Sequence, residues 1–157
     1  MSVDYIVASL PTLAFGAPAP MSWEKFLDAC GDAGPKAVLE LESGKWRDIE
    51  TQLRNAVAEA RGGAKWKREA RGCSVYWRNR VLACFQESDV AKRDEMLDRA
   101  WWDAAGELAD VSSPLGFGAL CAYAARLRIA LRRSLISADA GNAAFDRLTA
   151  ETKRDFS

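Results

Sequence analysis

Histidine is absent from this chain of 157 residues. Its absence removes the commonest general base of enzymes, the commonest metal ligand and the only side chain that titrates unperturbed near neutral pH. The sequence also lacks a phosphate-binding GxxxxGK(S/T) loop and a GxSxG nucleophile turn. Its one GxG triplet, Gly116-Phe117-Gly118, follows Pro114 at an expected helix start with no strand before it. We interpret the triplet as a turn, and we expect a protein that is not an enzyme and needs no cofactor or metal.

Net charge is also absent, because 22 basic and 22 acidic residues cancel. The charges are nevertheless segregated, with a net −4 over residues 1–60, +6 over 61–80 and −2 over 81–157. A neutral chain has no global field that would attract DNA or an anionic bilayer. Any such attraction would have to come from residues 61–80, which we call the basic segment.

Length and cysteine spacing favour one unbridged domain. A chain of this size buries about 70% of the surface of its unfolded form, so it needs no disulfide or metal to hold it together. The four cysteines, at positions 30, 73, 84 and 121, form no CxxC pair, which argues against a zinc site. We expect them to be reduced and partly buried in a cytoplasmic protein.

The longest uncharged run, residues 5–23, raises the question of a signal peptide. Asp4 precedes it, no Lys or Arg does, and three prolines interrupt it, so we expect it to belong to the mature fold. No other uncharged run approaches the roughly 20 residues of a membrane-spanning helix. We therefore expect no direct membrane insertion.

Apolar residues recur with the helical period over most of the chain. The spacing predicts helices over residues 23–30, 35–42, 46–60 and 75–85, one capped by Ser88 or Asp89, one starting at Ser113-Pro114, and a last one over 142–153. Residues 5–10 are too few to distinguish a strand from one helical turn, and residues 11–21 predict a loop. The expected fold is all-α: a single domain over residues 1–157 with about six or seven helices and an extended, proline-rich segment at 1–21 packed on it.

The basic segment is the most distinctive local feature. Its cations alternate with aromatic residues: Arg61, Lys65, Lys67, Arg68, Arg71, Arg78 and Arg80 with Trp66, Tyr76 and Trp77. This combination suits single-stranded nucleic acid, whose phosphates pair with cations and whose bases stack on rings. It also suits a helix pair whose rings face the core and whose cations face an acidic protein. Because the remainder of the chain is net −6, we favour the acidic protein partner.

Trp101 and Trp102 are adjacent on an expected helix. Neighbouring side chains on a helix point about 100° apart, so the two rings cannot both face one core. We expect Trp102 to lie at a boundary or a protein contact, where exposed tryptophan is enriched. The alternative is that this position packs against the N-terminal loop.

A carboxylate-based enzyme is a further hypothesis. Five acidic residues lie close together in the sequence: Asp94, Glu95, Asp98, Asp103 and Glu107. Paired carboxylates can divide acid and base roles between them. Three- and four-residue spacings are also those of ordinary ion pairs on a helix surface, here with Lys92 or Arg99. We favour a solvated helix face.

Several stretches resemble a bacterial family of unknown function whose genes accompany A/V-type ATP synthase operons. The resemblance is carried by residues 5–16 (YIVASLPTLAFG), 20–27 (PMSWEKFL), 46–60, 95–103 (EMLDRAWWD) and 117–129 (FGALCAYAARLRI), with Gly141 and Phe145 behind them. The family has no assigned catalytic residues. The resemblance implies a cytoplasmic accessory or stalk-associated component of the V-type ATPase, peripheral to the inner membrane through that complex. Its helical tail is similar in style to the helical subunit that caps the central rotor.

The resemblance and the charge pattern together define an expected function. We expect a non-enzymatic protein that binds V-type ATPase subunits; the alternative is a single-strand nucleic-acid-binding module at residues 61–80. The candidate contact residues are Arg61, Lys65, Lys67, Arg68, Arg71, Trp101 and Trp102.

Overall fold

The computed structural model describes residues 2–63, 65, 67, 68 and 74–155, with side chains described as far as residue 136. These residues form seven α-helices and one short 3₁₀ helix: α1 (Val3–Ser9), α2 (Trp23–Cys30), α3 (Ala33–Ser43), α4 (Lys45–Ala60), α5 (Val75–Cys84), α6 (Val90–Ala105), η2 (Gly106–Leu108) and α7 (Phe117–Asp155). No strand occurs in this part of the chain. The predicted all-α class is confirmed.

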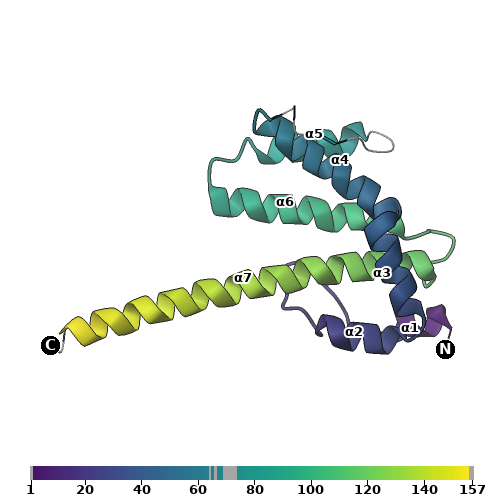
Figure 1. The fold of residues 1–157 in the computed structure, drawn as a ribbon, viewed down its shortest axis with the longest axis horizontal. Coiled ribbons are helices and arrows are strands. Elements are labelled where there is room, and N and C mark those ends of the chain that lie inside the picture. The colour runs from purple at the N-terminus through teal and green to yellow at the C-terminus, as the bar shows by residue number, and fades with distance from the viewer. Residues whose placement is uncertain (1, 64, 66, 69–73, 156–157) are drawn as a thin grey trace.

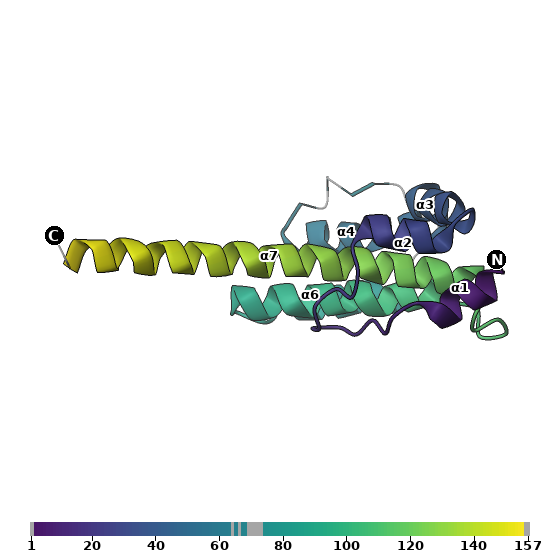
Figure 2. The same cartoon turned by 90° about the horizontal axis from the view of Figure 1, so that it is seen from below.

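Helix α7 organises the molecule (Figure 1). It packs against α1, α3, α6 and η2, while α4 packs against α3, α5 and α6. In the view of Figure 1, α2 lies below α7, and α4 and α5 lie above it. Its 39 residues make α7 about 58 Å long at 1.5 Å per residue. It continues past the ends of the other helices, as both ribbon views show (Figure 2).

Capping residues set the starts of α2 and α6 where the sequence predicts them. The Ser22 hydroxyl accepts a hydrogen bond from the Lys25 backbone N–H at 3.2 Å, and α2 has the predicted bounds. The Asp89 carboxylate accepts from the backbone N–H groups of Ala91 and Lys92 and caps α6. Of the two predicted caps for this helix, Asp89 is therefore the one used.

Two predictions about the chain ends differ from the structure. Residues 3–9 form helix α1, capped by the Ser2 hydroxyl, so of the two alternatives for residues 5–10 the helical turn is the one found, and residues 1–21 are not extended throughout. The loop covers residues 10–22 and contains a turn in which the Ala14 carbonyl accepts from the Ala17 N–H. Helix α7 begins at Phe117, after a turn in which the Ser113 carbonyl accepts from the Gly116 N–H. It then runs without a break through the position where a separate last helix was predicted. Gly141 lowers helix stability by only about 1 kcal/mol relative to alanine, which a neighbouring alanine-rich sequence offsets.

The core is built from the apolar faces that the helical period predicts. On α4 the buried residues are Trp46, Ile49, Leu53 and Ala56, four positions of one stripe. They join a cluster that includes Phe26 of α2 and Leu120 and Leu127 of α7, all fully buried. Among the described residues no helix combines the length and the apolar character needed to span a membrane.

The loop between α1 and α2 is held against the body by specific contacts. The Tyr123 hydroxyl of α7 donates to the Pro11 carbonyl at 2.8 Å. The Phe15 ring meets the Trp102 ring edge-on at a centroid distance of 5.6 Å. The guanidinium groups of Arg99 and Arg133 lie 5.1 and 4.7 Å from the centre of the same Phe15 ring. Phe15 therefore joins the loop to both α6 and α7.

Three cysteine thiols are buried in the fold, which makes their reactivity a test of the structure. Cys30, Cys84 and Cys121 are buried and unbridged, and Cys73 lies outside the described residues. Burial raises the pKa of Cys30 and of Cys121 to about 11. Since the thiolate is the reactive form, we expect iodoacetamide at about pH 8 to label these two thiols far more slowly in the folded protein than in denaturant. Peptide mass spectrometry measures both rates, and equal rates would contradict the burial.

Candidate functional site

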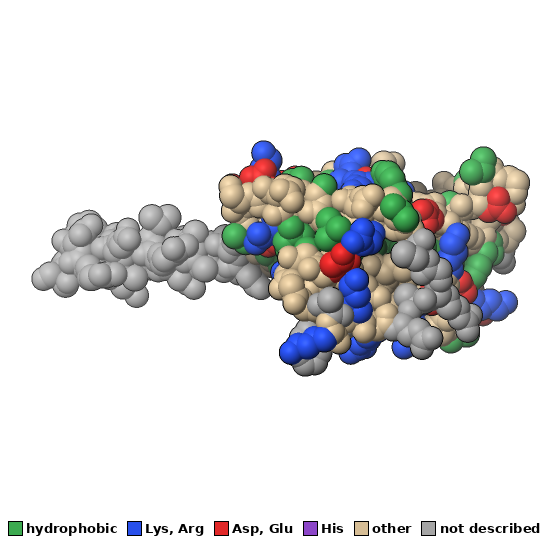
Figure 3. All heavy atoms as spheres, turned by 90° about the horizontal axis from the view of Figure 1, so that it is seen from above, with side chains coloured by type: hydrophobic (Ala, Val, Ile, Leu, Met, Phe, Trp, Pro, Cys, Tyr) green, Lys and Arg blue, Asp and Glu red, His purple; other side chains and the backbone are tan. Residues whose placement is uncertain are grey.

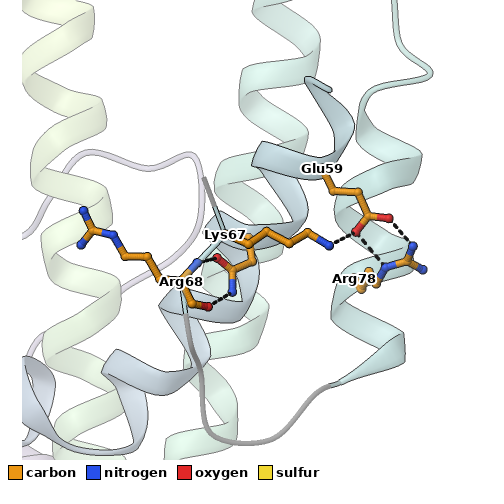
Figure 4. Close-up of polar contacts among 5 residues, drawn as sticks. Glu59, Lys67, Arg68 and Arg78 are labelled. Atoms are coloured by element: carbon orange, nitrogen blue, oxygen red, sulfur yellow. Dashed lines mark hydrogen bonds and ion pairs between the residues drawn. The ribbon is translucent and has the colours of Figure 1, made fainter. Parts of the chain in front are cut away.

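The described part of the basic segment runs from the end of α4 into the first turns of α5, and several of its cations are paired with acidic side chains. On the face that carries these helices, Lys and Arg side chains are spread out with acidic side chains between them (Figure 3). Glu59, near the end of α4, accounts for two of the cations. Its carboxylate accepts from Lys67 Nζ at 2.9 Å, from Arg78 Nε at 3.0 Å and from Arg78 Nη2 (Figure 4).

Arg68 is fixed through its backbone. Its N–H donates to Asn55 Oδ1 at 2.8 Å, and its carbonyl accepts from Asn55 Nδ2 at 2.6 Å. In Figure 4 the guanidinium of Arg68 points away from Glu59 and Arg78. One side-chain amide of α4 thus positions Arg68 while leaving its charged group on the surface.

The other predicted cations have different surroundings. Arg61 ends α4, and its guanidinium lies 5.8 Å from the centre of the Phe85 ring. Lys65 is exposed, whereas Arg71 and Trp66 lie outside the described residues. The exposed candidates that the structure describes are therefore Arg61, Lys65, Lys67 and Arg68, of which Lys67 is held by Glu59.

The aromatic residues of the basic segment are split between core and surface. Trp77 is 6% exposed, and its Nε1–H donates to Glu107 Oε1 at 2.5 Å. Arg80 lies 5.6 Å from the centre of the Trp77 ring and pairs with Asp103 at 2.5 Å. Tyr76 is 63% exposed. Trp77 is consequently not accessible for stacking on a nucleic-acid base, which leaves Tyr76 as the one described ring of this segment on the surface.

Glu59 makes the attachment of the basic segment sensitive to acid. Hydrogen bonds from Arg78 and then Lys67 lower the pKa of Glu59 from 4.5 to about 2. A carboxyl whose pKa falls on folding stabilises the fold above its unfolded pKa, and this contribution is lost as the pH falls toward the folded value. We therefore expect the melting temperature to decline between about pH 4.5 and pH 2 more steeply in the wild type than in Glu59→Gln.

Glu95→Gln is the matched control for this measurement, because Glu95 is exposed and has no ion pair within the described chain. The melting temperature of this control should fall with pH as steeply as that of the wild type between about pH 4.5 and pH 2. Identical slopes in the wild type and in Glu59→Gln would show that Glu59 does not hold the segment.

The prediction for the tryptophan pair is wrong in its choice of residue. Trp102 is 6% exposed and packs with Ile129, Ala130 and the loop residues Leu13 and Phe15, whereas Trp101 is half-buried. The helix sets the direction of each side chain, but its burial depends on which element lies in that direction, and here the N-terminal loop covers Trp102. The alternative, that Trp102 packs against the N-terminal loop, is therefore correct. Of the two rings, Trp101 is the one that remains partly exposed and could contact a partner.

Two of the clustered carboxylates, Asp98 and Asp103, act as ion-pair partners, whereas Asp94 and Glu95 lie exposed on α6 as a solvated helix face would have them. Asp98 binds Arg132 and Arg133 of α7, the latter at 2.9 Å, and Asp103 binds Arg80 at 2.5 Å and Arg99 at 3.4 Å. The pairs with Arg80, Arg132 and Arg133 join α6 to α5 and to α7. Within the described residues, no group of three or more Cys, Asp or Glu side chains is placed to hold a metal ion.

Sequence reasoning missed the residues that organise this surface. Asn55 and Glu59 lie on the polar side of α4, where a helical pattern gives no reason to single them out. The one available signal was the position of Glu59 two residues before the first cation of the basic segment.

Comparison with known proteins gives no match for this chain, whether with protein-family models, with curated proteins or with solved structures.

Proposed function

We propose that this protein is a non-enzymatic accessory component of a bacterial A/V-type ATP synthase and acts by binding subunits of that complex. The proposal starts from the sequence resemblance to the family encoded with these synthases. It would place the protein in the cytoplasm, peripheral to the inner membrane through the complex.

The stretches that carry the resemblance contact one another in this structure. The rings of Phe26 and Tyr123 stack at a centroid distance of 5.7 Å. Tyr123 also binds the Pro11 carbonyl, and the Arg128 guanidinium lies 4.6 Å from the centre of the Trp23 ring. Three stretches that are far apart in the sequence therefore form one packed unit around the first half of α7.

The observation that carries a binding role is the length of α7. Ala91 near the start of α6 and Ile136 of α7 line the same cavity, so α7 leaves the body close to residue 136. The helix continues to Asp155, and we call residues 137–155 the α7 extension. Most helical stability in proteins comes from packing an apolar face on a neighbour. A partner helix along the extension would provide that packing.

Two exposed apolar residues mark the base of the α7 extension. Leu135 is 64% exposed and Ile136 is 60% exposed, on consecutive positions of the helix. Burying such side chains contributes about 1.5–3 kcal/mol each. We propose that they begin the contact with the synthase, and that the exposed cations Arg61, Lys65, Lys67 and Arg68 form a second contact with an acidic surface of it.

Native co-purification tests this function. Tagged full-length protein, produced in its own cells at native level, should recover synthase subunits that mass spectrometry identifies. The double variant Leu135→Lys/Ile136→Lys should lose them, because two charges would enter an apolar contact while the helix propensity stays high. Val111→Lys/Leu115→Lys, which alters two exposed apolar residues in the loop before α7, should retain them. Recovery of no synthase subunit by the wild type at any salt concentration would overturn the proposal.

A further inference from the structure

Two apolar grooves meet at Leu39 on the outer side of α3. The first, of about 460 Å³, lies between α2 and α3 and is lined by Leu27, Pro35, Val38 and Leu39. The second, of about 450 Å³, lies where α3 faces α1 and the start of α7, and is lined by Val3, Leu39 and Phe117. Leu39 is 62% exposed, so it stands as a ridge between the two grooves.

The sequence of α3 explains why apolar residues lie on its outer side. Gly34, Ala37 and Leu41 are buried against the body. Pro35, Val38, Leu39 and Glu42 follow the i, i+3, i+4, i+7 spacing of a second helical face, three of whose four members are apolar. A solvated helix face would carry polar residues at these positions, so this face has the composition of a contact surface.

Carboxylates surround both grooves. Asp28 and Glu42 line the first groove, and Asp32 and Glu40 line the second, against a single cation, Lys36. No ion pair joins any of the four carboxylates to a described cation. The Glu40 carboxylate accepts a hydrogen bond from the Lys45 backbone N–H at 3.2 Å. The surface therefore combines exposed apolar side chains with the negative charges of Asp28, Asp32 and Glu42, which are exposed and pair with no described cation.

We propose that this surface, formed by α1, α2, α3 and the start of α7, binds a cationic amphipathic helix of a partner protein. The partner's apolar side chains enter the two grooves on either side of Leu39, and its lysines or arginines face Asp28 and Glu42 on one side and Asp32 on the other. Helix-in-groove recognition of this kind uses apolar anchors at helical spacing, with charge setting orientation and specificity. This contact is separate from the α7 extension and goes beyond the synthase proposal.

Two other occupants fit the surface less well. An anionic lipid surface would be repelled by four carboxylates. A second copy of this chain would have to offer cations beside exposed apolar residues, as α5 does next to Val75 and Tyr76 and α7 does next to Leu135 and Ile136. The cations there are already held: Arg78 and Arg80 by Glu59 and Asp103, and Arg132 and Arg133 by Asp98. A separate basic helix is the occupant that the charges favour.

The test titrates the full-length protein with a synthetic peptide of leucine and lysine, about 14 residues or four helical turns long, patterned with the helical period. Isothermal calorimetry measures the affinity. We expect Leu39→Lys and Glu42→Lys each to weaken binding about tenfold or more. The matched controls are Val75→Lys, which changes an equally exposed apolar residue on α5, and Glu95→Lys, which makes the same charge change on α6. Both controls should bind within about twofold of the wild type.

Several outcomes would overturn the proposal. Binding absent up to about 1 mM peptide would do so, as would equal weakening by all four variants, which would indicate non-specific charge attraction. Equal affinity for the same peptide with glutamate in place of lysine would show that the carboxylates do not select a cationic partner. A wild-type dimer in sedimentation that Leu39→Lys dissociates would assign the surface to a second copy. The four altered residues are exposed, and circular dichroism of each variant confirms that it remains folded.

Discussion

Replacing Trp102 with alanine is expected to destabilise the fold by about 3–5 kcal/mol, the range for truncating a buried large aromatic residue. The ring is 6% exposed, meets Phe15 edge-on at 5.6 Å and lies 5.5 Å from the guanidinium of Arg126. Its removal would leave a cavity between α6, α7 and the N-terminal loop. Because small domains have a total stability of about 5–15 kcal/mol, the loss is a large share of it. Denaturant unfolding followed by circular dichroism measures the change.

Trp101→Ala is the natural comparison, because it removes the same side chain one position away. Trp101 is half-buried, so its loss should destabilise the protein by at least about 1 kcal/mol less than the loss of Trp102. If Trp102→Ala changed stability by less than about 1 kcal/mol, Trp102 could not be a core residue, and its assignment to the surface would have to be restored.

Gly118→Ala is expected to be the other severe single change, with a loss of about 1–3 kcal/mol or more. A Cβ at position 118 would lie 2.3 Å from the Leu108 carbonyl oxygen and 3.4 Å from the Ala109 Cα. The atoms that the new Cβ would meet belong to the backbone of residues 108 and 109, which cannot rotate away as a side chain can. The start of α7 would therefore have to separate from η2. Thermal unfolding of the variant measures the loss.

Gly34→Ala is the control, since it makes the same substitution in another helix. The nearest atoms to its Cβ, in Leu27, would be at 3.4 Å, which is ordinary contact. We expect a change in stability of less than about 1 kcal/mol, with the helix preference of alanine favouring a gain. Similar effects at the two positions would contradict the close approach of α7 to η2.

Local signals in the sequence predicted most of the helices. The stripe from Trp46 to Ala56 and the caps at Ser22 and Asp89 act within one or two turns of helix, so neighbouring residues alone determine them. The joining of two predicted helices into α7 could not be seen in the same way. Gly141 and Asn142 are compatible both with the middle of a helix and with its end.

The side-chain environment of the candidate surface was less predictable, because it depends on contacts between distant residues. The basic segment was identified from composition, but its pairing with Glu59 and Asn55 depends on how the chain returns to α4. The choice between Trp101 and Trp102 likewise depends on Phe15, some 85 residues earlier, since its loop covers one ring and not the other. A helical period gives the directions of side chains but not what lies in each direction.

The segregation of charge along the sequence has different consequences in the basic segment and in the acidic N-terminal third. The net +6 of residues 61–80 directed attention to the cations, yet Glu59 and Asp103 bind several of them. The acidic N-terminal third, by contrast, retains carboxylates without ion pairs beside the grooves of α3. The proposed binding surface on α3 therefore rests on carboxylates without an ion pair rather than on charge density along the sequence.

If the α7 extension contacts the synthase, its backbone amides should be protected in the complex. Amide hydrogen exchange of residues 137–155 is to be compared between the free protein and the protein purified with synthase subunits. We predict that these amides exchange at least about tenfold more slowly in the complex, because a partner helix would stabilise the α7 extension against local opening. Exchange at the same rate in both states, with protection appearing elsewhere, would contradict the claim.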